Sequence, residues 1–316
     1  MARATRYGVV AVGVLAIAGL ASAVGRGGGD GGDERPEPAA VPAEVLSRTE
    51  ELVDRTRPTA ATGDQPSRPE RRLVTITYYP ADGGPLPLIV FAHGNTVSDP
   101  GHYQALLRSW AAAGYVVAAP IFPLSSTRLP GAAGDLVNQP ADVSFVISEM
   151  LRLSDGPATP YAGRIDPGRV AAAGHSLGAM TTLGAVFHSC CRDTRVKAGI
   201  VLAGVERPFP NGEFFPAPVR TPILVVHGDA DPLLPLAGAR RIFDHAAPPK
   251  FLLTVLGGDH DVPYAGSNGQ ARPETLVVMT ATRDFLDRYL KGEGDLDRMR
   301  RNLAGEPLAR LETEDG

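Results

Sequence analysis

The stretch "RVAAAGHSLGAMTTLGAVF", residues 169–187, decides the fold class of this chain. It begins with small apolar residues typical of a buried strand and continues as an apolar segment of helical length, with Ser176 at the change. Gly174 and Gly178 stand two positions before and two positions after the serine. A turn that runs directly from strand to helix crowds these two positions, and residues without a Cβ atom relieve the crowding.

The pattern G-x-S-x-G is the nucleophile elbow, which holds a serine on a strained turn at the end of a strand. This turn would expose the Oγ atom of Ser176, while the first N–H groups of the helix point toward any negative charge that forms beside it. The alternative is that Ser176 only caps the helix. A cap would explain the serine but would not explain both glycines.

A serine hydroxyl becomes a good nucleophile when a base accepts its proton and a carboxylate orients that base. In this kind of site the order along the chain is Ser, then Asp or Glu, then His. His260 follows a strand end, in the loop "GGDHDVPY", and is the predicted base. Of the other histidines after the serine, His188 and His245 lie in helical segments. His227 lies inside a strand, where a packed core histidine is expected.

The segment "HGDADPLLP" offers two carboxylates for the base, Asp229 and Asp231. We predict Asp231, because it lies further along the loop, and we expect Asp229 to bond backbone in the turn. Asp259 and Asp261 flank the predicted base, although adjacent side chains diverge. As metal ligands, "DHD" lacks the spacing of a metal site, so we predict neither a metal nor another cofactor.

The second part of such a site is a pair of backbone N–H groups that bind the oxyanion of the reaction. The loop "HGNTVSD" follows an early strand, and we predict the N–H groups of Asn95 and Leu177 as the donors. Loss of one such donor costs on the order of 3 kcal/mol of transition-state stabilisation. The alternative is that His93 and Gly94 only form a turn at the end of the strand.

From residue 71 onward, short β-rich segments alternate with longer helical segments. This alternation predicts an α/β fold with a mostly parallel, twisted sheet and helices on both of its faces. We expect strands at 71–80, 85–94, 115–120, 169–174, 196–204, 221–228 and 250–258, and helices at 103–113, 135–153, 176–187, 236–246 and 272–290. Only 16 residues, 205–220, separate two of these strands, too few for a large lid.

The first 23 residues have the pattern of a secretory signal peptide: basic residues, an apolar run, and a small-x-small site at Ala21-Ser22-Ala23. The apolar run is about as long as the shortest membrane span, so an uncleaved N-terminal anchor is the alternative. We therefore expect a secreted or extracytoplasmic protein, tethered to the membrane if the segment is retained.

The rest of the chain divides into three further parts by composition. Residues 24–70 are expected to be a flexible linker and lead-in, of which 25–44 combine glycine, proline and acidic charge. Residues 71–292 form the predicted catalytic domain. Residues 293–316 are a charged C-terminal extension, expected to hold a short surface helix and a tail.

Composition restricts the possible functions. Apolar residues make up 43% and charged residues 21% of the 316 residues, as in an ordinary globular domain, and the net charge of −4 gives no basic surface for nucleic acid. We expect a monomer.

Cys190 and Cys191 are the only cysteines. A vicinal disulfide and two buried free thiols both remain open, because adjacent Cα atoms are about 3.8 Å apart, closer than in ordinary disulfides.

The chain resembles the α/β-hydrolase family from about residue 71 to 290. Four segments in order carry the resemblance: "FAHGN", "IDPGRVAAAGHSLGA", "VVHGDADPLLP" and "GGDH". Without a lid, the chain is similar to the platelet-activating-factor acetylhydrolase, dienelactone hydrolase and cutinase-like branches. The resemblance implies hydrolysis of carboxylic esters, with Ser176, Asp231 and His260 as catalytic triad and Asn95 and Leu177 as oxyanion donors.

The chain also departs from those branches. Polyester-degrading relatives carry an aromatic residue where Asn95 stands, a tryptophan in the region of "LAGVERPFP", and a terminal disulfide that this chain lacks. The dienelactone branch commonly uses cysteine in place of Ser176. We therefore expect a secreted or surface serine esterase acting on a small-molecule or lipid ester. The alternatives are a peptidase or thioesterase with the same triad, and an idle α/β-hydrolase scaffold that only binds a ligand.

Overall fold

The computed structural model describes residues 44–62, 65–95, 101–125, 133–266 and 270–315. The chain divides into two units, residues 1–40 and 41–316, and every helix and strand described belongs to the second unit. The expected signal peptide and residues 24–43 of the expected linker lie outside the described residues. None of the helices described is long and apolar enough to cross a bilayer.

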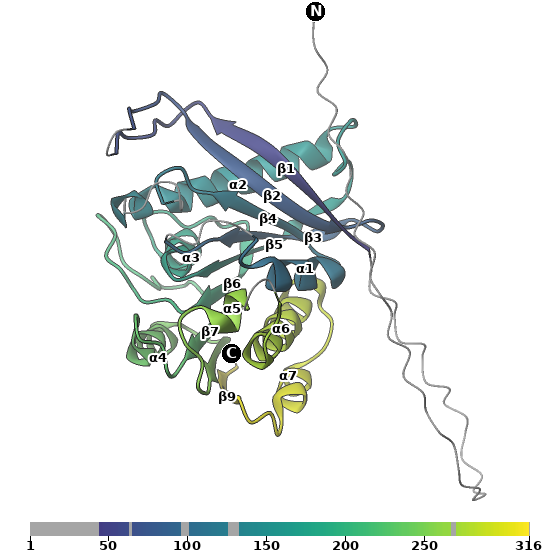
Figure 1. Ribbon diagram of the computed structural model, residues 1–316, viewed down its shortest axis with the longest axis vertical. Coiled ribbons are helices and arrows are strands. Elements are labelled where there is room, and N and C mark those ends of the chain that lie inside the picture. The colour runs from purple at the N-terminus through teal and green to yellow at the C-terminus, as the bar shows by residue number, and fades with distance from the viewer. Residues whose placement is uncertain (1–43, 63–64, 96–100, 126–132, 267–269, 316) are drawn as a thin grey trace, which may run out of the picture. The chain divides into compact units, whose positions relative to one another are not determined.

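A single sheet of nine strands forms the centre of the second unit, in the order β1-β2-β4-β3-β5-β6-β7-β8-β9 (Figure 1). The strands from β4 to β8 in this order are parallel, whereas β1, β2 and β9 are antiparallel to their neighbours. This confirms the predicted mostly parallel sheet. The strands are β1 Val45–Asp54, β2 Arg71–Pro80, β3 Leu86–Ala92, β4 Val116–Ile121, β5 Ile165–His175, β6 Val196–Leu202, β7 Ile223–Gly228, β8 Lys250–Val255 and β9 Ala309–Glu314.

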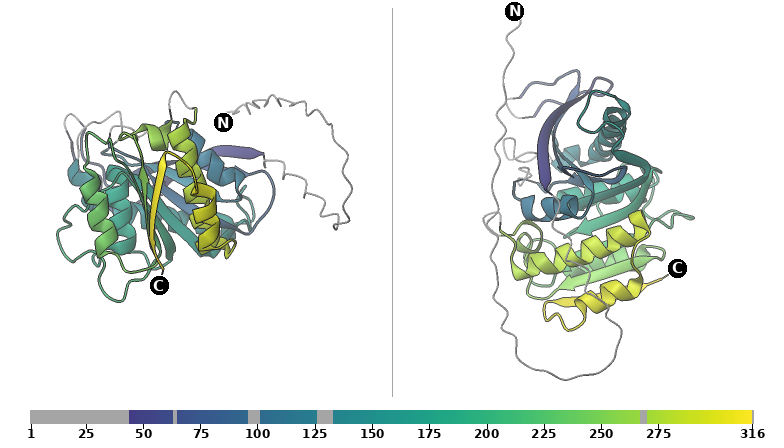
Figure 2. Two further views of the ribbon diagram at one scale, coloured as in Figure 1. Left: turned by 90° about the horizontal axis from the view of Figure 1, so that it is seen from below. Right: turned by 90° about the vertical axis from the view of Figure 1, so that its right-hand side faces the viewer.

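Helices cover both faces of this sheet, as Figure 2 shows from two sides. One apolar core lies under α1 Gln104–Ala112, α5 Val262–Ala265, α6 Pro273–Leu286 and α7 Leu296–Leu303. The other lies under α2 Gln139–Asp155, α3 Leu177–Phe187 and α4 Leu236–His245. Strands β7 and β8 are buried along their whole length. A strand covered on both faces needs apolar residues at successive positions, which explains the continuous apolar runs in the sequence.

The N-terminal edge of the sheet differs from the expected linker. Residues in the lead-in form β1, which pairs with β2 along its whole length. Its sequence "VLSRTEELVD" has few apolar residues, because an edge strand has one neighbour and most of its side chains stay partly or fully exposed. Only Leu52 of its apolar residues is fully buried, so the segment lacks the pattern that identified the central strands.

The C-terminal extension also differs from the expectation of a surface helix followed by a tail. The helix is present as α7, but Met299 and Leu303 bury their side chains in the core. The expected tail is strand β9, antiparallel to β8, with Leu311 opposite Leu253. Charged residues dominate its sequence "ARLETE", which is again typical of an edge strand.

The helix expected at residues 135–153 is divided. A 3₁₀ turn, η1 Ala133–Val137, precedes α2, and Pro140 lies in the first turn of α2, where its missing N–H leaves no partner unsatisfied. The last long helix likewise ends in a π-helical turn, η2 Asp287–Lys291.

Residues 205–220 contain no helix, in agreement with the prediction that this segment forms no large lid. They form an extended loop held against the end of α3. The N–H of Phe215 donates to the carbonyl of Phe187 over 2.7 Å, and His188 forms a β-bridge with Phe214.

Candidate active site

Ser176 lies on the turn between β5 and α3, with φ 55° and ψ −116°. A positive φ is strained for a residue with a Cβ atom, and such strain is characteristic of the nucleophile elbow. The serine side chain accepts no hydrogen bond from the helix that it precedes. Ser176 thus occupies the position before the first residue of α3, but its side chain does not cap the helix.

The two glycines of the motif relieve two different contacts. A Cβ atom at Gly174 would lie 2.1 Å from the carbonyl oxygen of Gly178, as the elbow predicts. A Cβ atom at Gly178 would lie 2.0 Å from the carbonyl oxygen of Ala92, at the end of β3. The first glycine therefore allows the turn, and the second allows α3 to start against the neighbouring strand.

Three side chains from three loops meet at this turn. The Nε2 atom of His260 is 2.9 Å from the Oγ of Ser176, and its Nδ1 is 2.7 Å from the Oδ2 of Asp231. His260 lies between β8 and α5 and is 6% exposed, and Asp231 follows β7. Because an ionised carboxylate only accepts, Nδ1 carries the hydrogen and Nε2 accepts the hydroxyl proton of the serine.

The environment of Asp231 favours its ionised form. Burial alone would raise the pKa of this carboxyl, but the hydrogen bond from His260 and those from the N–H groups of Leu234 and Leu233 outweigh it and hold the pKa below its ordinary value. The carboxylate is therefore charged at neutral pH and can stabilise a positive charge on the imidazole.

The neighbouring carboxylates bond elsewhere. The Oδ1 of Asp229 accepts the N–H of Gly257 over 2.6 Å, the backbone role expected for it. The Oδ1 of Asp259 accepts the N–H groups of Asp261 and Val262, where α5 begins. Of Asp229, Asp231, Asp259 and Asp261, only Asp231 forms a hydrogen bond with the imidazole of His260.

His227 is buried inside β7, as expected for a core histidine, but it has an additional contact that the sequence did not indicate. Its Nε2 is 2.9 Å from the carbonyl oxygen of Leu234 and 3.3 Å from the Oδ2 of Asp231. Burial lowers the pKa of His227, which keeps the ring neutral with its hydrogen on Nε2. The ring therefore helps to hold the loop that carries Asp231.

The loop after β3 lies directly beside the serine. A Cβ atom at Gly94 would be 3.4 Å from the Cβ of Ser176. His93 holds this loop: its Nε2 accepts the N–H of Phe122 over 3.0 Å, so its Nδ1 carries the hydrogen and donates to the carbonyl of Gly94 over 2.7 Å. Burial lowers the pKa of His93 to about 4, so the ring is neutral.

The contact from His93 also orients the next N–H group. A peptide unit is planar and trans, so the carbonyl of Gly94 and the N–H of Asn95 point in opposite directions from the same plane. Holding that carbonyl on His93 therefore fixes the direction of the N–H of Asn95. Leu177 is the first residue of α3, and the first N–H groups of a helix have no partner within it. Both predicted oxyanion donors thus lie on segments next to Ser176.

Two groups of described side chains bring three atoms of metal-binding type within 4.8 Å of one another: His188 with Cys190 and Cys191, and His175 with His260 and Asp261. The two sulfur atoms of the first group are joined in a disulfide. In the second group, all four ring nitrogens already take part in hydrogen bonds. Neither group has a full set of free ligand atoms.

An apolar cluster adjoins the start of α3. We define it as Leu136, Leu177, Met180 and Phe209, with Val205, Phe214, Leu234 and Cys191 packed against them. Its members come from η1, from α3, from the turn after α3 that holds Cys191, and from the loops that follow β6 and β7. Because these loops follow the carboxyl ends of strands, the cluster lies at the same edge of the sheet as Ser176.

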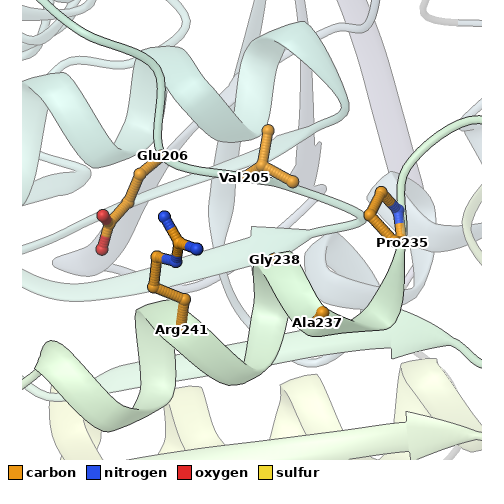
Figure 3. A pocket seen from close by; sticks show the side chains of 6 residues that line it. All are labelled: Val205, Glu206, Pro235, Ala237, Gly238 and Arg241. Carbon is orange, nitrogen blue, oxygen red and sulfur yellow. The ribbon is translucent and has the colours of Figure 1, made fainter.

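A small hollow lies between the loop after β6 and the start of α4, and it shares Val205 with this cluster (Figure 3). Its volume is about 180 Å³, and Val205, Pro235 and Ala237 contribute apolar surface. Figure 3 shows the charged ends of Glu206 and Arg241 facing each other at one side. Pockets for whole drug-sized ligands measure about 300–1,000 Å³, so the hollow has room for one small group only.

The Cys190–Cys191 disulfide lies at the border of the apolar cluster. It follows α3, and the Nδ1 of His188 accepts the N–H of Cys190 over 3.2 Å. Of the two possibilities left open by the sequence, the structure has the vicinal disulfide.

The sequence model of the Chlorophyllase family matches residues 48–206, half of the chain, from within β1 to the loop after β6. The chain belongs to the Chlorophyllase family. This α/β-hydrolase family membership identifies it as a carboxylic ester hydrolase, as the resemblance implied. The match includes most of β1, so the part of the chain that the family model covers extends into the expected lead-in.

The fold of this Chlorophyllase family member is also found among solved structures. A ferulic acid esterase from Streptomyces cinnamoneus superposes with a TM-score of 0.65 at 20% identity, covering 88% of this chain and 98% of the esterase. At that identity the likeness concerns the fold. No curated protein matches the chain.

Proposed function

We propose that this protein is a serine esterase that works through an acyl-enzyme intermediate. The single observation that carries the proposal is the continuous contact Ser176–His260–Asp231, with distances of 2.9 and 2.7 Å, at a strained turn. Both distances fall within the range that proton transfer between a nucleophile and its base requires.

The mechanism has two half-reactions. His260 accepts the hydroxyl proton as the Oγ of Ser176 attacks the ester carbonyl, and Asp231 stabilises the resulting imidazolium. The N–H groups of Asn95 and Leu177 bind the oxyanion of the tetrahedral intermediate. His260 then gives its proton to the leaving alcohol. Water, activated by the same imidazole, attacks the acyl-enzyme, releases the acid and restores the serine hydroxyl.

The substrate we propose is a small-molecule or lipid ester with at least one apolar or aromatic arm. The apolar cluster supports this class, because Leu177 belongs both to the cluster and to the proposed oxyanion site. The matching family is named for chlorophyllase and the similar solved structure is a ferulic acid esterase, and both names support an ester substrate. A series of p-nitrophenyl esters from acetate to decanoate, together with methyl ferulate, would define the preferred arm.

Ser176→Ala is the direct test of this function. We expect kcat on p-nitrophenyl acetate to fall by roughly a millionfold, since loss of a triad serine has effects of that order. The melting temperature should not decrease, because alanine preserves the backbone and removes only the hydroxyl. A variant that retained most of its activity would refute the mechanism.

Two alternatives use the same scaffold. A peptidase or thioesterase would also lose activity in Ser176→Ala, but would prefer an amide or thioester over the matched oxygen ester. An idle binding protein would show no turnover of any ester in the unmodified chain. The complete set of hydrogen bonds from Asp231 to Ser176 favours the enzyme.

We further propose that residues 1–23 direct export and that the mature protein is a monomer. The basic, apolar and small-x-small order of the N-terminus supports export. Both edge strands of the sheet carry several charged residues, which oppose pairing between copies. N-terminal sequencing of the exported protein would distinguish a cleaved signal from a retained anchor, and size-exclusion chromatography would test the oligomeric state.

A further inference from the structure

Tyr103 and His175 take no part in the proposed mechanism, yet they are buried between its components. Tyr103 lies just before α1 and is 0% exposed, and His175 ends β5 and is 1% exposed. A buried polar group costs free energy unless it is hydrogen-bonded. All the side-chain polar atoms of these two residues are bonded, and their partners are parts of the candidate site.

The hydrogen bonds run in one direction. The N–H of Gly94 donates to the hydroxyl oxygen of Tyr103 over 3.2 Å. The Nε2 of His175 is 2.7 Å from the carbonyl oxygen of His260, and because a carbonyl only accepts, Nε2 carries a hydrogen. Burial lowers the pKa of His175 to about 3, so the ring is neutral and its Nδ1 accepts the hydroxyl hydrogen of Tyr103 over 2.9 Å.

This chain of bonds connects three segments that lie far apart in the sequence. It begins at Gly94, whose neighbour carries a proposed oxyanion donor, passes the residue before the nucleophile, and ends on the backbone of the proposed base. The packing around it is close. A Cβ atom at Gly94 would lie 3.2 Å both from the Nδ1 of His175 and from the hydroxyl of Tyr103.

We propose that Tyr103 and His175 are positioning residues that hold the oxyanion loop and the loop of the base at fixed distances from Ser176. The inference rests on the proposed function. Preorganised donors stabilise a transition state because they need not reorient as charge develops, and a displacement of about 1 Å can cost a hundredfold in rate. The buried bonds of Tyr103 and His175 provide that rigidity without contacting the substrate.

Tyr103→Phe removes one oxygen and leaves the ring in place. We expect kcat on p-nitrophenyl butyrate to fall by about tenfold to a hundredfold, with KM within about twofold of the unmodified enzyme. Tyr115→Phe is the matched control. Tyr115 is also fully buried in the same core, and its hydroxyl donates to Asp287 over 2.7 Å, remote from Ser176. The Tyr115→Phe variant should lose about as much stability as Tyr103→Phe and keep the kcat of the unmodified enzyme.

Variants of His175 separate positioning from packing. His175→Leu removes both hydrogen bonds and should lower kcat at least as far as Tyr103→Phe. His175→Gln places an amide N–H near the position of Nε2 and should recover most of that loss. The affinity for a trifluoromethyl ketone, which forms a tetrahedral adduct on the serine, should fall in parallel with kcat. The affinity for the alcohol of the same shape should not change.

Three results would overturn the inference: a kcat within twofold of the unmodified enzyme in Tyr103→Phe and His175→Leu, an equal loss in Tyr115→Phe, or ketone affinity that does not follow kcat. If His175→Leu fails to fold, the comparison of Tyr103→Phe with Tyr115→Phe decides the question. The proposed function fails separately, through an active Ser176→Ala. An inactive Ser176→Ala with an unaffected Tyr103→Phe rejects only the positioning role.

Discussion

Asp229 and Asp231 stand two positions apart on one loop, and their surroundings give them different roles. The side chain of Asp231 is fully buried, receives two backbone N–H groups, and contacts both His260 and His227. Asp229 is exposed and holds only the N–H of Gly257. Residue type alone cannot distinguish these two environments, but position along the loop predicted the right partner for the base.

The two asparagine variants test this difference. Asp231→Asn should lower kcat by about 10⁴, because the amide cannot stabilise an imidazolium and favours the wrong tautomer of His260. Asp229→Asn keeps an oxygen that can accept the N–H of Gly257, so its kcat should stay within about threefold. Steady-state kinetics on p-nitrophenyl acetate measures both. Equal losses in the two variants would contradict the assignment of Asp231.

The sequence predicted the roles that a known motif defines. It missed the roles that depend on a hydrogen-bond partner in the folded protein. Ser176 stands in a recognisable pattern, and the order along the chain then selected His260 and Asp231. The roles of His93, Tyr103, His175 and His227 carry no such signal, because they depend on atoms that lie 7 to 85 positions away or on tautomers set by burial. The one indication in the sequence was the position of His227 inside a buried strand, where a packed core histidine is expected.

The helices and strands also differ in how well the sequence predicts them, and the difference lies between the centre and the edges of the sheet. The central strands were predictable because burial on both faces demands continuous apolar runs. Strands β1 and β9 were not, because an edge strand pairs mainly through its backbone and can carry charged side chains. The ion pair between Arg240 and Glu312, which joins α4 to β9, could not be inferred from two residues 72 positions apart.

The contact between α3 and β3 gives a prediction at the level of elements. In Gly178→Ala the new Cβ would lie 2.0 Å from the carbonyl oxygen of Ala92, so the helix and the strand would have to separate. We expect a loss of about 1–3 kcal/mol in the free energy of unfolding, and a lower kcat because Leu177 and the loop after β3 move apart. Gly134→Ala is the control, since a Cβ there meets no atom within 4 Å.

Denaturant unfolding and ester hydrolysis, measured on both variants, would check this prediction. A Gly178→Ala variant with the stability and kcat of the unmodified protein would show that the close approach of α3 to β3 is not required.

Over the whole molecule, buried neutral histidines make stability depend on pH. The pKa of His93 is lowered to about 4 and that of His175 to about 3, mainly by burial, whereas an unfolded histidine has a pKa near 6.5. Below pH 6.5 the unfolded state therefore binds more protons than the folded state, so stability falls as pH falls. Between pH 7 and 5 each ring should account for about 2 kcal/mol of the loss.

Urea denaturation at pH 7, 6 and 5 measures this loss. In His175→Gln the titrating ring is absent, so the loss between pH 7 and 5 should be about 2 kcal/mol smaller than in the unmodified protein. Carboxylates contribute little in this range, because unfolded Asp and Glu titrate near pH 4. An identical pH dependence in the two proteins would show that His175 is not held neutral by burial.

Labelling with a fluorophosphonate tests the central claim most directly, since only a serine activated by its base displaces fluoride from the reagent. We expect one adduct per molecule by intact mass, located by peptide mapping to Ser176, and almost none in His260→Ala. An adduct on another residue, or none on a folded and unmodified chain, would contradict the assignment of Ser176 as the nucleophile.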